Sequence, residues 1–177
     1  MGKLRIDALA ETHIDQIIHA CRDWEELAPF GAPYWRPRSA AELRRKIADT
    51  SGSSLASAYS FVIYDDDQLV GECSLHGIDW RNRVTSVGIC IWDPALRRSG
   101  YGQYGPEQMI SWAFNHLGML RIEAWINEGN EPSLKLYEAL GFTHEGVLRQ
   151  RYFEGGRGKD LHVLSLLHSD YAQGLKH

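Results

Sequence analysis

Apolar residues recur along this chain at two spacings, and the spacing predicts which segments are strands and which are helices. Strands are predicted in the first half at 3–9, 58–65, 69–79 and 83–92, with a turn over 65–68 that forms a hairpin. Helical spacing predicts one helix over 12–27 and another that begins after Ser39, where Ser39 and Glu42 form a capping box. Three prolines in 28–38 place a loop between these helices.

The second half of the chain predicts two further helices and three strands. A core-facing helix is predicted by the apolar stripe Met109, Ile110, Ala113, Phe114 and Leu117. Because Pro106 lacks an amide proton, we expect this helix to begin near Tyr104 or Gly105. A short helix follows over 130–140, and strands are predicted at 119–126, 142–153 and 158–167.

These elements define the expected fold class. Six to seven strands, mostly in hairpins, alternate with about four helices, which is typical of a mixed α/β (α+β) fold with a mostly antiparallel sheet. The sequence contains no repeat, low-complexity tract or linker. We therefore expect a single domain over 1–177.

Composition and charge exclude several classes of function. The net charge of −4 argues against a nucleic-acid partner and is compatible with a cationic substrate. The three cysteines lie far apart without C-x-x-C spacing, and the histidines show no metal-ligand spacing, so neither a disulfide framework nor a metal is expected. Apolar runs of signal-peptide or membrane-spanning length are missing, which predicts a cytoplasmic protein without membrane association.

The segment 97–105, RRSGYGQYG, contains the G-x-G-x-x-G spacing of a dinucleotide-binding loop. That interpretation is disfavoured because half of the chain precedes the loop and because two arginines stand before the first glycine. A purely structural turn is the other alternative. Physically, the loop offers free amides at a helix N-terminus, and Gly100 and Gly102 allow close approach of a diphosphate, with Arg97 and Arg98 as cationic donors.

At this loop the sequence resembles the GCN5-related N-acetyltransferase (GNAT) superfamily. RRSGYG, residues 97–102, matches the R/Q-x-x-G-x-G acetyl-CoA loop, and NEPSLKLYEALGF, residues 130–142, is similar to the N-x-x-S-x-x-x-Y-E-x-x-G-F helix of the family. The resemblance is nearest to the branch of ribosomal-protein alanine, polyamine and aminoglycoside acetyltransferases. It implies a splay between the fourth and fifth strands, acetyl-CoA as co-substrate, and frequent homodimers.

The resemblance also implies a role for individual residues. Tyr137 matches the tyrosine that protonates the departing sulfur, although its helical spacing also fits an ordinary core aromatic. Asn130 matches the asparagine that meets the pantetheine arm, and it fits an N-cap equally well. The residues expected to bind the coenzyme are Ile89, Ile91, Arg97, Arg98, Ser99, Gly100, Tyr101, Gly102, Asn130, Ser133 and Tyr137.

Ser86 departs from the family pattern, because many relatives carry a glutamate here that acts as general base. An alkylamine of pKa about 10.4 is almost fully protonated at neutral pH, so the missing base matters. Either the acceptor has a low pKa, or Glu72 or His76 on the neighbouring strand replaces the base. A surface carboxylate and a half-buried histidine are the structural alternatives for these two residues.

A protein-binding surface is one interpretation of the aromatic segment 24–38, whereas the resemblance to the family implies that this segment forms the wall of the acceptor site. Apolar walls with a few carboxylates suit a cation with an organic body, and the candidates are Trp24, Glu25, Glu26, Phe30, Tyr34 and Trp35, with His76 from the strand. The expected function is transfer of an acetyl group from acetyl-CoA to a primary amine of a small molecule or a protein N-terminus in a ternary complex. The alternative is a catalytically weak CoA-binding module that acts as a sensor or interaction partner.

Overall fold

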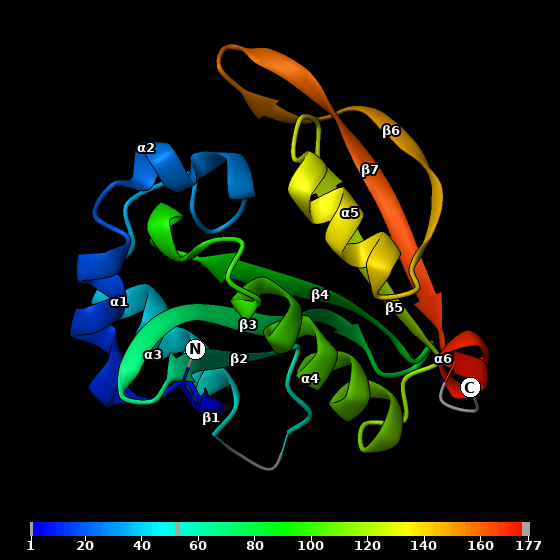
Figure 1. Cartoon of the computed structure of the whole chain (residues 1–177), viewed down its shortest axis with the longest axis horizontal. Coiled ribbons are helices and arrows are strands. Elements are labelled where there is room, and N and C mark those ends of the chain that lie inside the picture. Colours follow the sequence, from blue (N-terminus) through cyan, green and yellow to red (C-terminus); the bar gives the residue numbers. More distant parts are fainter. Residues whose placement is uncertain (1, 52–53, 175–177) are drawn as a thin grey trace.

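The structure, a computed structural model, describes residues 2–51 and 54–174, which contain one seven-stranded sheet (Figure 1). The strand order is β1-β2-β3-β4-β5-β7-β6, and only the β4–β5 pair is parallel. The strands are β1 (Leu4–Ala8), β2 (Ala58–Asp65), β3 (Gln68–Asp79), β4 (Val84–Ile91), β5 (Arg121–Asn127), β6 (Thr143–Glu154) and β7 (Arg157–Leu167). This confirms the predicted mixed, mostly antiparallel sheet.

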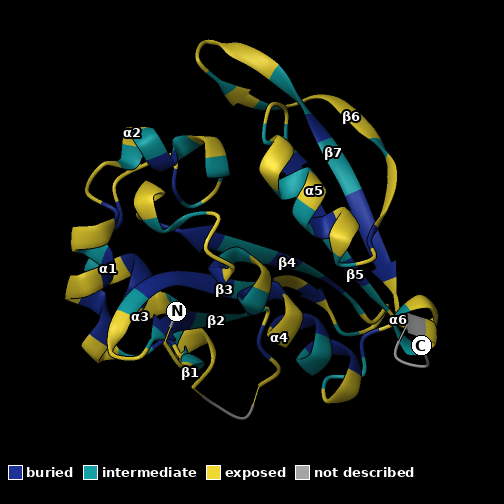
Figure 2. Ribbon diagram, viewed as in Figure 1, coloured by how far each residue is buried: buried dark blue, intermediate teal, exposed yellow. Residues whose placement is uncertain are grey.

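Helices cover both faces of the sheet, and each face has its own core (Figures 1 and 2). The helices are α1 (Ile14–Ala20), α2 (Trp24–Leu27), α3 (Ala40–Asp49), α4 (Tyr101–Asn115), α5 (Glu131–Ala139) and α6 (His168–Gly174). Alternation along β2 shows the division: Ile63 packs in the core beneath α4 and α5, whereas Val62 and Tyr64 pack in the core beneath α1 and α3.

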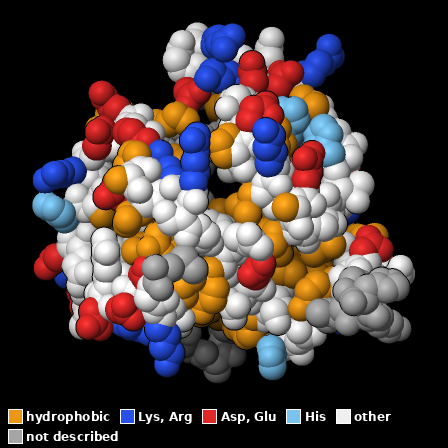
Figure 3. All heavy atoms as spheres, in the orientation of Figure 1, with side chains coloured by type: hydrophobic (Ala, Val, Ile, Leu, Met, Phe, Trp, Pro, Cys, Tyr) orange, Lys and Arg blue, Asp and Glu red, His pale blue; other side chains and the backbone are white. Residues whose placement is uncertain are grey.

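The parallel pair β4–β5 is short, and the two strands separate beyond it. Only Val84/Arg121, Thr85/Ile122 and Ser86/Glu123 are paired. At the far end of β5, Asn127 Nδ2 donates to the carbonyl of Pro29, 2.9 Å away, so the loop after α2 bridges the gap. Figure 3 shows a hollow between the side of the molecule that carries α2 and the side that carries α5. The expected splay between the fourth and fifth strands is therefore present.

Two helix predictions need correction, and one helix was missed. The helix expected over 12–27 is interrupted, because the Asp23 side chain accepts the amide of Glu26 (3.3 Å) and starts α2 as a new helix. Helix α4 begins at Tyr101 rather than near Tyr104, with Pro106 inside it; a proline in the second turn removes only the bond to the Gly102 carbonyl. Helix α6 was not predicted. No helix in the described ranges has the length and apolar character needed to cross a membrane.

Candidate functional site

The glycine-rich loop leads from β4 through a short 3-10 turn, Pro94–Leu96, to the N-terminus of α4. Gly100 adopts φ 85° and Arg98 φ 66°, so the loop uses the left-handed region that glycine tolerates best. Within the described residues, the amides of 98–102 donate to no other group of the chain. A Cβ built on Gly102 would meet nothing within 4 Å. The loop therefore offers several free amides at the helix N-terminus next to an uncrowded position, which suits an anion.

Arg97 does not face this open space, contrary to the expectation that it binds phosphate. Its guanidinium makes a bidentate ion pair with Glu26 of α2 at 2.5 and 2.8 Å. It also donates to the carbonyls of Ile91 (3.0 Å) and Trp92 (3.2 Å). The same contact removes Glu26 from the candidates for acceptor binding. Arg97 and Glu26 instead fasten α2 to the loop, because a bidentate pair fixes both side chains.

The other side chains of the loop divide into two groups. Arg98 and Ser99 are exposed, and the structure records no ion pair for Arg98 in the ranges it describes, so both can reach a ligand. The Tyr101 ring is buried, and its hydroxyl donates to Asp65 at 2.6 Å. Only the backbone of Tyr101 is therefore available at the helix terminus.

Tyr137 reaches across the splay from α5 to β4. Its hydroxyl donates to the Val87 carbonyl at 3.4 Å, one residue beyond the last paired residue of β4, and its side chain is 2% exposed. Burial raises the pKa of Tyr137 far above 10, so the phenol is protonated at neutral pH. At the start of α5, Asn130 Oδ1 accepts the amide of Ser133 at 3.3 Å, which confirms the N-cap role of Asn130.

The edge of β4 that faces the splay carries the backbone groups of Ile89 and Ile91. Val87 directs its carbonyl toward Tyr137, and strand alternation directs the amides and carbonyls of Ile89 and Ile91 the same way. The Ile91 carbonyl is already used by Arg97. The remaining groups on this edge can pair with an extended ligand in place of a strand.

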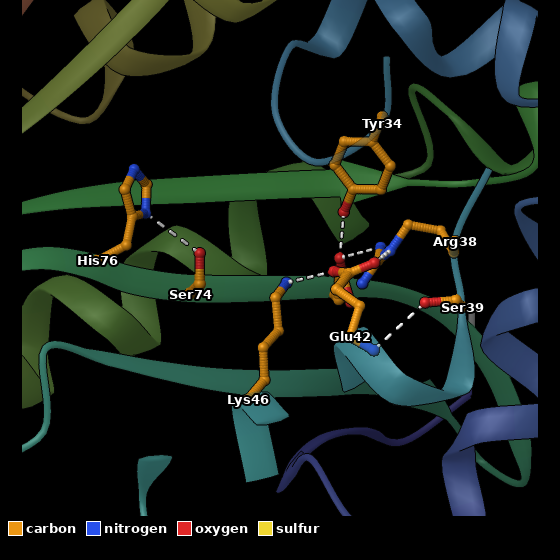
Figure 4. Close-up of polar contacts among 8 residues, drawn as sticks. Tyr34, Arg38, Ser39, Glu42, Lys46, Ser74 and His76 are labelled. Carbon is orange, nitrogen blue, oxygen red and sulfur yellow. Dashed lines mark hydrogen bonds and ion pairs between the residues drawn. The ribbon is translucent and has the colours of Figure 1, made fainter. Parts of the chain in front are cut away.

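On the opposite face of the sheet, His76 lies beside Ser86. The two residues are register partners in β3–β4, and a Cβ on Gly88 would approach His76 Cε1 to 3.3 Å, so the ring lies over Gly88. Ser74 Oγ is 3.3 Å from His76 Nδ1, and Figure 4 shows the other ring nitrogen pointing away from Ser74. The ring is exposed at the cleft, yet partial desolvation against the sheet, together with the Lys46 charge, lowers the pKa of His76.

Glu72 does not lie where a base could meet an acceptor. It is buried, and Oε1 accepts Arg38 Nη1 at 2.8 Å and the hydroxyl of Tyr34 (Figure 4). Burial alone would raise the pKa of Glu72, but Arg38, Lys46 and the Tyr34 hydroxyl hold it below its ordinary value. Glu72 and Tyr34 are therefore parts of a buried ion network that joins the loop before α3 to the sheet, and Tyr34 does not line the acceptor site as expected.

The remaining aromatic candidates do not form one wall. Trp24 is half-buried on α2, whereas Trp35 is 57% exposed with the Arg36 guanidinium 5.5 Å from its ring centroid.

The sequence analysis missed Glu123 and Trp125, which lie on the same face of β5. The alternation along the strand 119–126 was visible in the sequence, but the pairing of Glu123 with Ser86 was not, because it depends on the register between β4 and β5. Two grooves of about 520 and 410 Å³ lie around α1 and Trp92, and the smaller one extends to Glu26 and to the turn before the glycine-rich loop.

Comparison with known proteins agrees with this geometry. Residues 3–143 match the family model described as "Acetyltransferase (GNAT) domain". An uncharacterized N-acetyltransferase, p20, of Bacillus licheniformis is 29% identical over 140 residues, covering 79% of this chain and 78% of that protein. The putative ribosomal N-acetyltransferase YdaF of Bacillus subtilis is 29% identical over 143 residues, covering 81% and 74%.

A solved structure shares the fold. The crystal structure of spermidine N-acetyltransferase from Vibrio cholerae in complex with CoA and spermine superimposes with a TM-score of 0.81 at 24% identity. The alignment covers 96% of this chain and 98% of that one. At this identity the likeness concerns the arrangement of the elements.

Proposed function

Because this chain belongs to the GNAT acetyltransferase family, we propose that it transfers the acetyl group of acetyl-CoA directly to a primary amine. The observation that carries the proposal is the alignment of three features along β4: the free amides of 98–102, the splay, and the buried Tyr137 hydroxyl at Val87. We further propose that residues 1–177 act as one domain. Similar proteins named for a ribosomal acceptor or for spermidine support an amine acceptor.

The residues present fit coenzyme A. The amides of 98–102, with the exposed Arg98, would hold its diphosphate, because aligned N–H groups at a helix N-terminus favour an anion. The edge groups of Ile89 and Ile91 would pair with the pantetheine amides inside the splay. The thioester supplies the activated acetyl group, and the sulfur would lie near Tyr137.

The chain's own residues then perform the proton transfers. The lowered pKa of His76 leaves it neutral at pH 7, able to accept the proton that the acceptor ammonium must lose before it attacks. Attack by the amine would form the N–C bond, and an edge amide of Ile89 or Ile91 that the pantetheine leaves free would stabilise the oxyanion. Tyr137 would donate its proton to the sulfur as the C–S bond breaks, and the second proton lost by the attacking nitrogen would return through solvent to the Tyr137 phenolate, so that the products are the amide and the thiol. Desolvation at this position would also raise the pKa of the departing thiol, which would favour proton transfer from Tyr137.

The first test separates coenzyme binding from folding. Gly102 faces open space in the first turn of α4, so Gly102→Glu should leave stability unchanged or higher, since an acidic residue is favourable there. The same carboxylate would repel a diphosphate, and calorimetry should show at least about tenfold weaker CoA binding than for the neutral, isosteric Gly102→Gln. Equal CoA affinity of both variants would remove the loop from the coenzyme site.

The second test concerns chemistry. Tyr137→Phe removes one weak hydrogen bond, at 3.4 Å, so we expect an unchanged melting temperature and unchanged CoA affinity. Loss of the general acid should lower kcat for amine acetylation by about a hundredfold to ten-thousandfold. If the wild-type protein binds CoA but acetylates no primary amine, the CoA-binding module is the better interpretation.

A further inference from the structure

Glu123 lies beside the position where the acceptor would attack. His76, Ser86 and Glu123 are register partners across β3, β4 and β5, so their side chains lie in one row on the face opposite α4 and α5. The pair Ser86/Glu123 is the last one before the splay opens. A carboxylate is thus present next to Ser86, on the neighbouring strand.

Two neighbours hold this carboxylate in place. Arg121 Nε donates to Glu123 Oε1 at 2.8 Å, and Trp125 Nε1 donates to Glu123 Oε2 at 3.0 Å. Each oxygen keeps a further lone pair, and the side chain is 20% exposed. Arg121 is shared with Glu145, at 2.8 and 2.5 Å. Arg121 therefore divides its donors between two carboxylates, and it compensates the charge of Glu123 only in part.

Trp125 supplies an independent observation that a cation suits this position. Its side chain is 44% exposed, unusual for a tryptophan on a central strand. The Arg151 guanidinium of β6 lies 5.5 Å from the ring centroid. Arg151 is itself exposed. The chain therefore already places a positively charged group over this indole, and an exposed arginine can be displaced by a ligand cation.

We propose that Glu123 and Trp125 form a subsite for a second, non-reacting ammonium group of the acceptor. The proposal rests on the proposed function, and it narrows the acceptor to diamines and polyamines. One amine lies at His76 and Ser86 for acetylation, while the other ammonium is held by the Glu123 carboxylate and the Trp125 ring. Glu123 is a specificity-determining residue, and it takes no part in bond making.

Calorimetry with straight-chain α,ω-diaminoalkanes and the n-alkylamines of the same carbon number tests this subsite, with and without CoA. The wild type should bind at least one diamine more tightly than its monoamine, and added salt should reduce that preference. Glu123→Gln should lower the preference about tenfold or more through loss of a charge-assisted contact, with CoA affinity unchanged. Arg151→Ala should instead strengthen diamine binding. The control is Glu107→Gln, which removes an exposed carboxylate on α4. This variant should change neither the preference for diamines nor the affinity for CoA.

The opposite signs expected for Glu123→Gln and Arg151→Ala separate a binding site from a general loss of structure. The proposal is overturned if the wild type binds diamines and monoamines equally, or if Glu123→Gln keeps the diamine preference. Because the measurement is binding, a wild type that prefers diamines yet acetylates none of them contradicts the proposed transferase activity and supports the subsite.

Discussion

Removing the cation of the buried network should destabilise this protein far more than removing a surface cation. The Arg38 side chain is 1% exposed and contacts Glu42 at 2.9 Å and Glu72 at 2.8 Å, both of which are 8% exposed. Arg38→Met approximately keeps the volume, but it leaves the two buried carboxylates with Lys46, 3.6 Å from Glu42, and the neutral Tyr34 hydroxyl, which contacts Glu72. Breaking one side of a buried pair costs about 3–5 kcal/mol, because the remaining charge stays desolvated.

Arg44→Met is the matched control. Arg44 pairs with Glu11 at 2.7 Å, but the two side chains are 61% and 60% exposed, so loss of this pair should cost less than about 1 kcal/mol. Urea titration at neutral pH measures both free energies of unfolding. For a domain of this size the Arg38 variant should also melt about 6–20 °C lower. Equal costs for the two variants would refute the assignment of the network as buried and structural.

The cost of Arg38→Met should also depend on pH. In the wild type the pKa of Glu72 is lowered, so its ionised form contributes stability above the unfolded pKa, and that contribution is lost as pH falls through the folded value. Without Arg38, burial raises the pKa of Glu72 in the folded protein. The stability of the variant then falls as pH rises above the pKa that Glu72 has in the unfolded chain. The difference between variant and wild type should therefore shrink from pH 7 toward pH 4. A difference that is constant with pH would contradict this account.

Two further predictions concern the base and the packing of α4. The charge of Lys46 contributes to the lowered pKa of His76. Lys46→Met should therefore move the acidic limb of the kcat/KM profile for amine acetylation to higher pH. An unmoved limb would exclude His76 as the base. A Cβ on Gly105 would lie 2.9 Å from the Cδ1 atoms of Ile63 and Ile89. Gly105→Val should therefore lower the free energy of unfolding, measured by urea titration, by about 1–3 kcal/mol. An unchanged free energy would mean that α4 can shift away from the sheet.

The elements that could be predicted from the sequence are those that local chemistry determines. The seven strands and the N-cap Asn130 follow from residues that are neighbours in the sequence. The start of α4 was wrong because Pro106 was given more weight than the helix that extends on both sides of it. Local patterns are reliable where one residue's backbone requirement decides the structure.

The roles of charged side chains could not be predicted, because their partners are distant in sequence. Arg97 resembled a phosphate ligand until Glu26, 71 residues away, was found to neutralise it. Glu72 resembled a base, and its partner Arg38 is 34 positions away. Glu123 became a candidate only through the parallel register of β4 and β5, which no local pattern encodes.

The separation of β4 from β5 leaves an unpaired strand edge inside the molecule. Such edges at the periphery of a sheet invite pairing with other chains, and proteins usually blunt or cover them. Here Tyr137 covers the edge at Val87 from one side, and the Pro29–Asn127 contact closes the far end. The protein thus keeps unpaired hydrogen-bonding groups of β4 inside the molecule, between two contacts that limit how another chain could reach them.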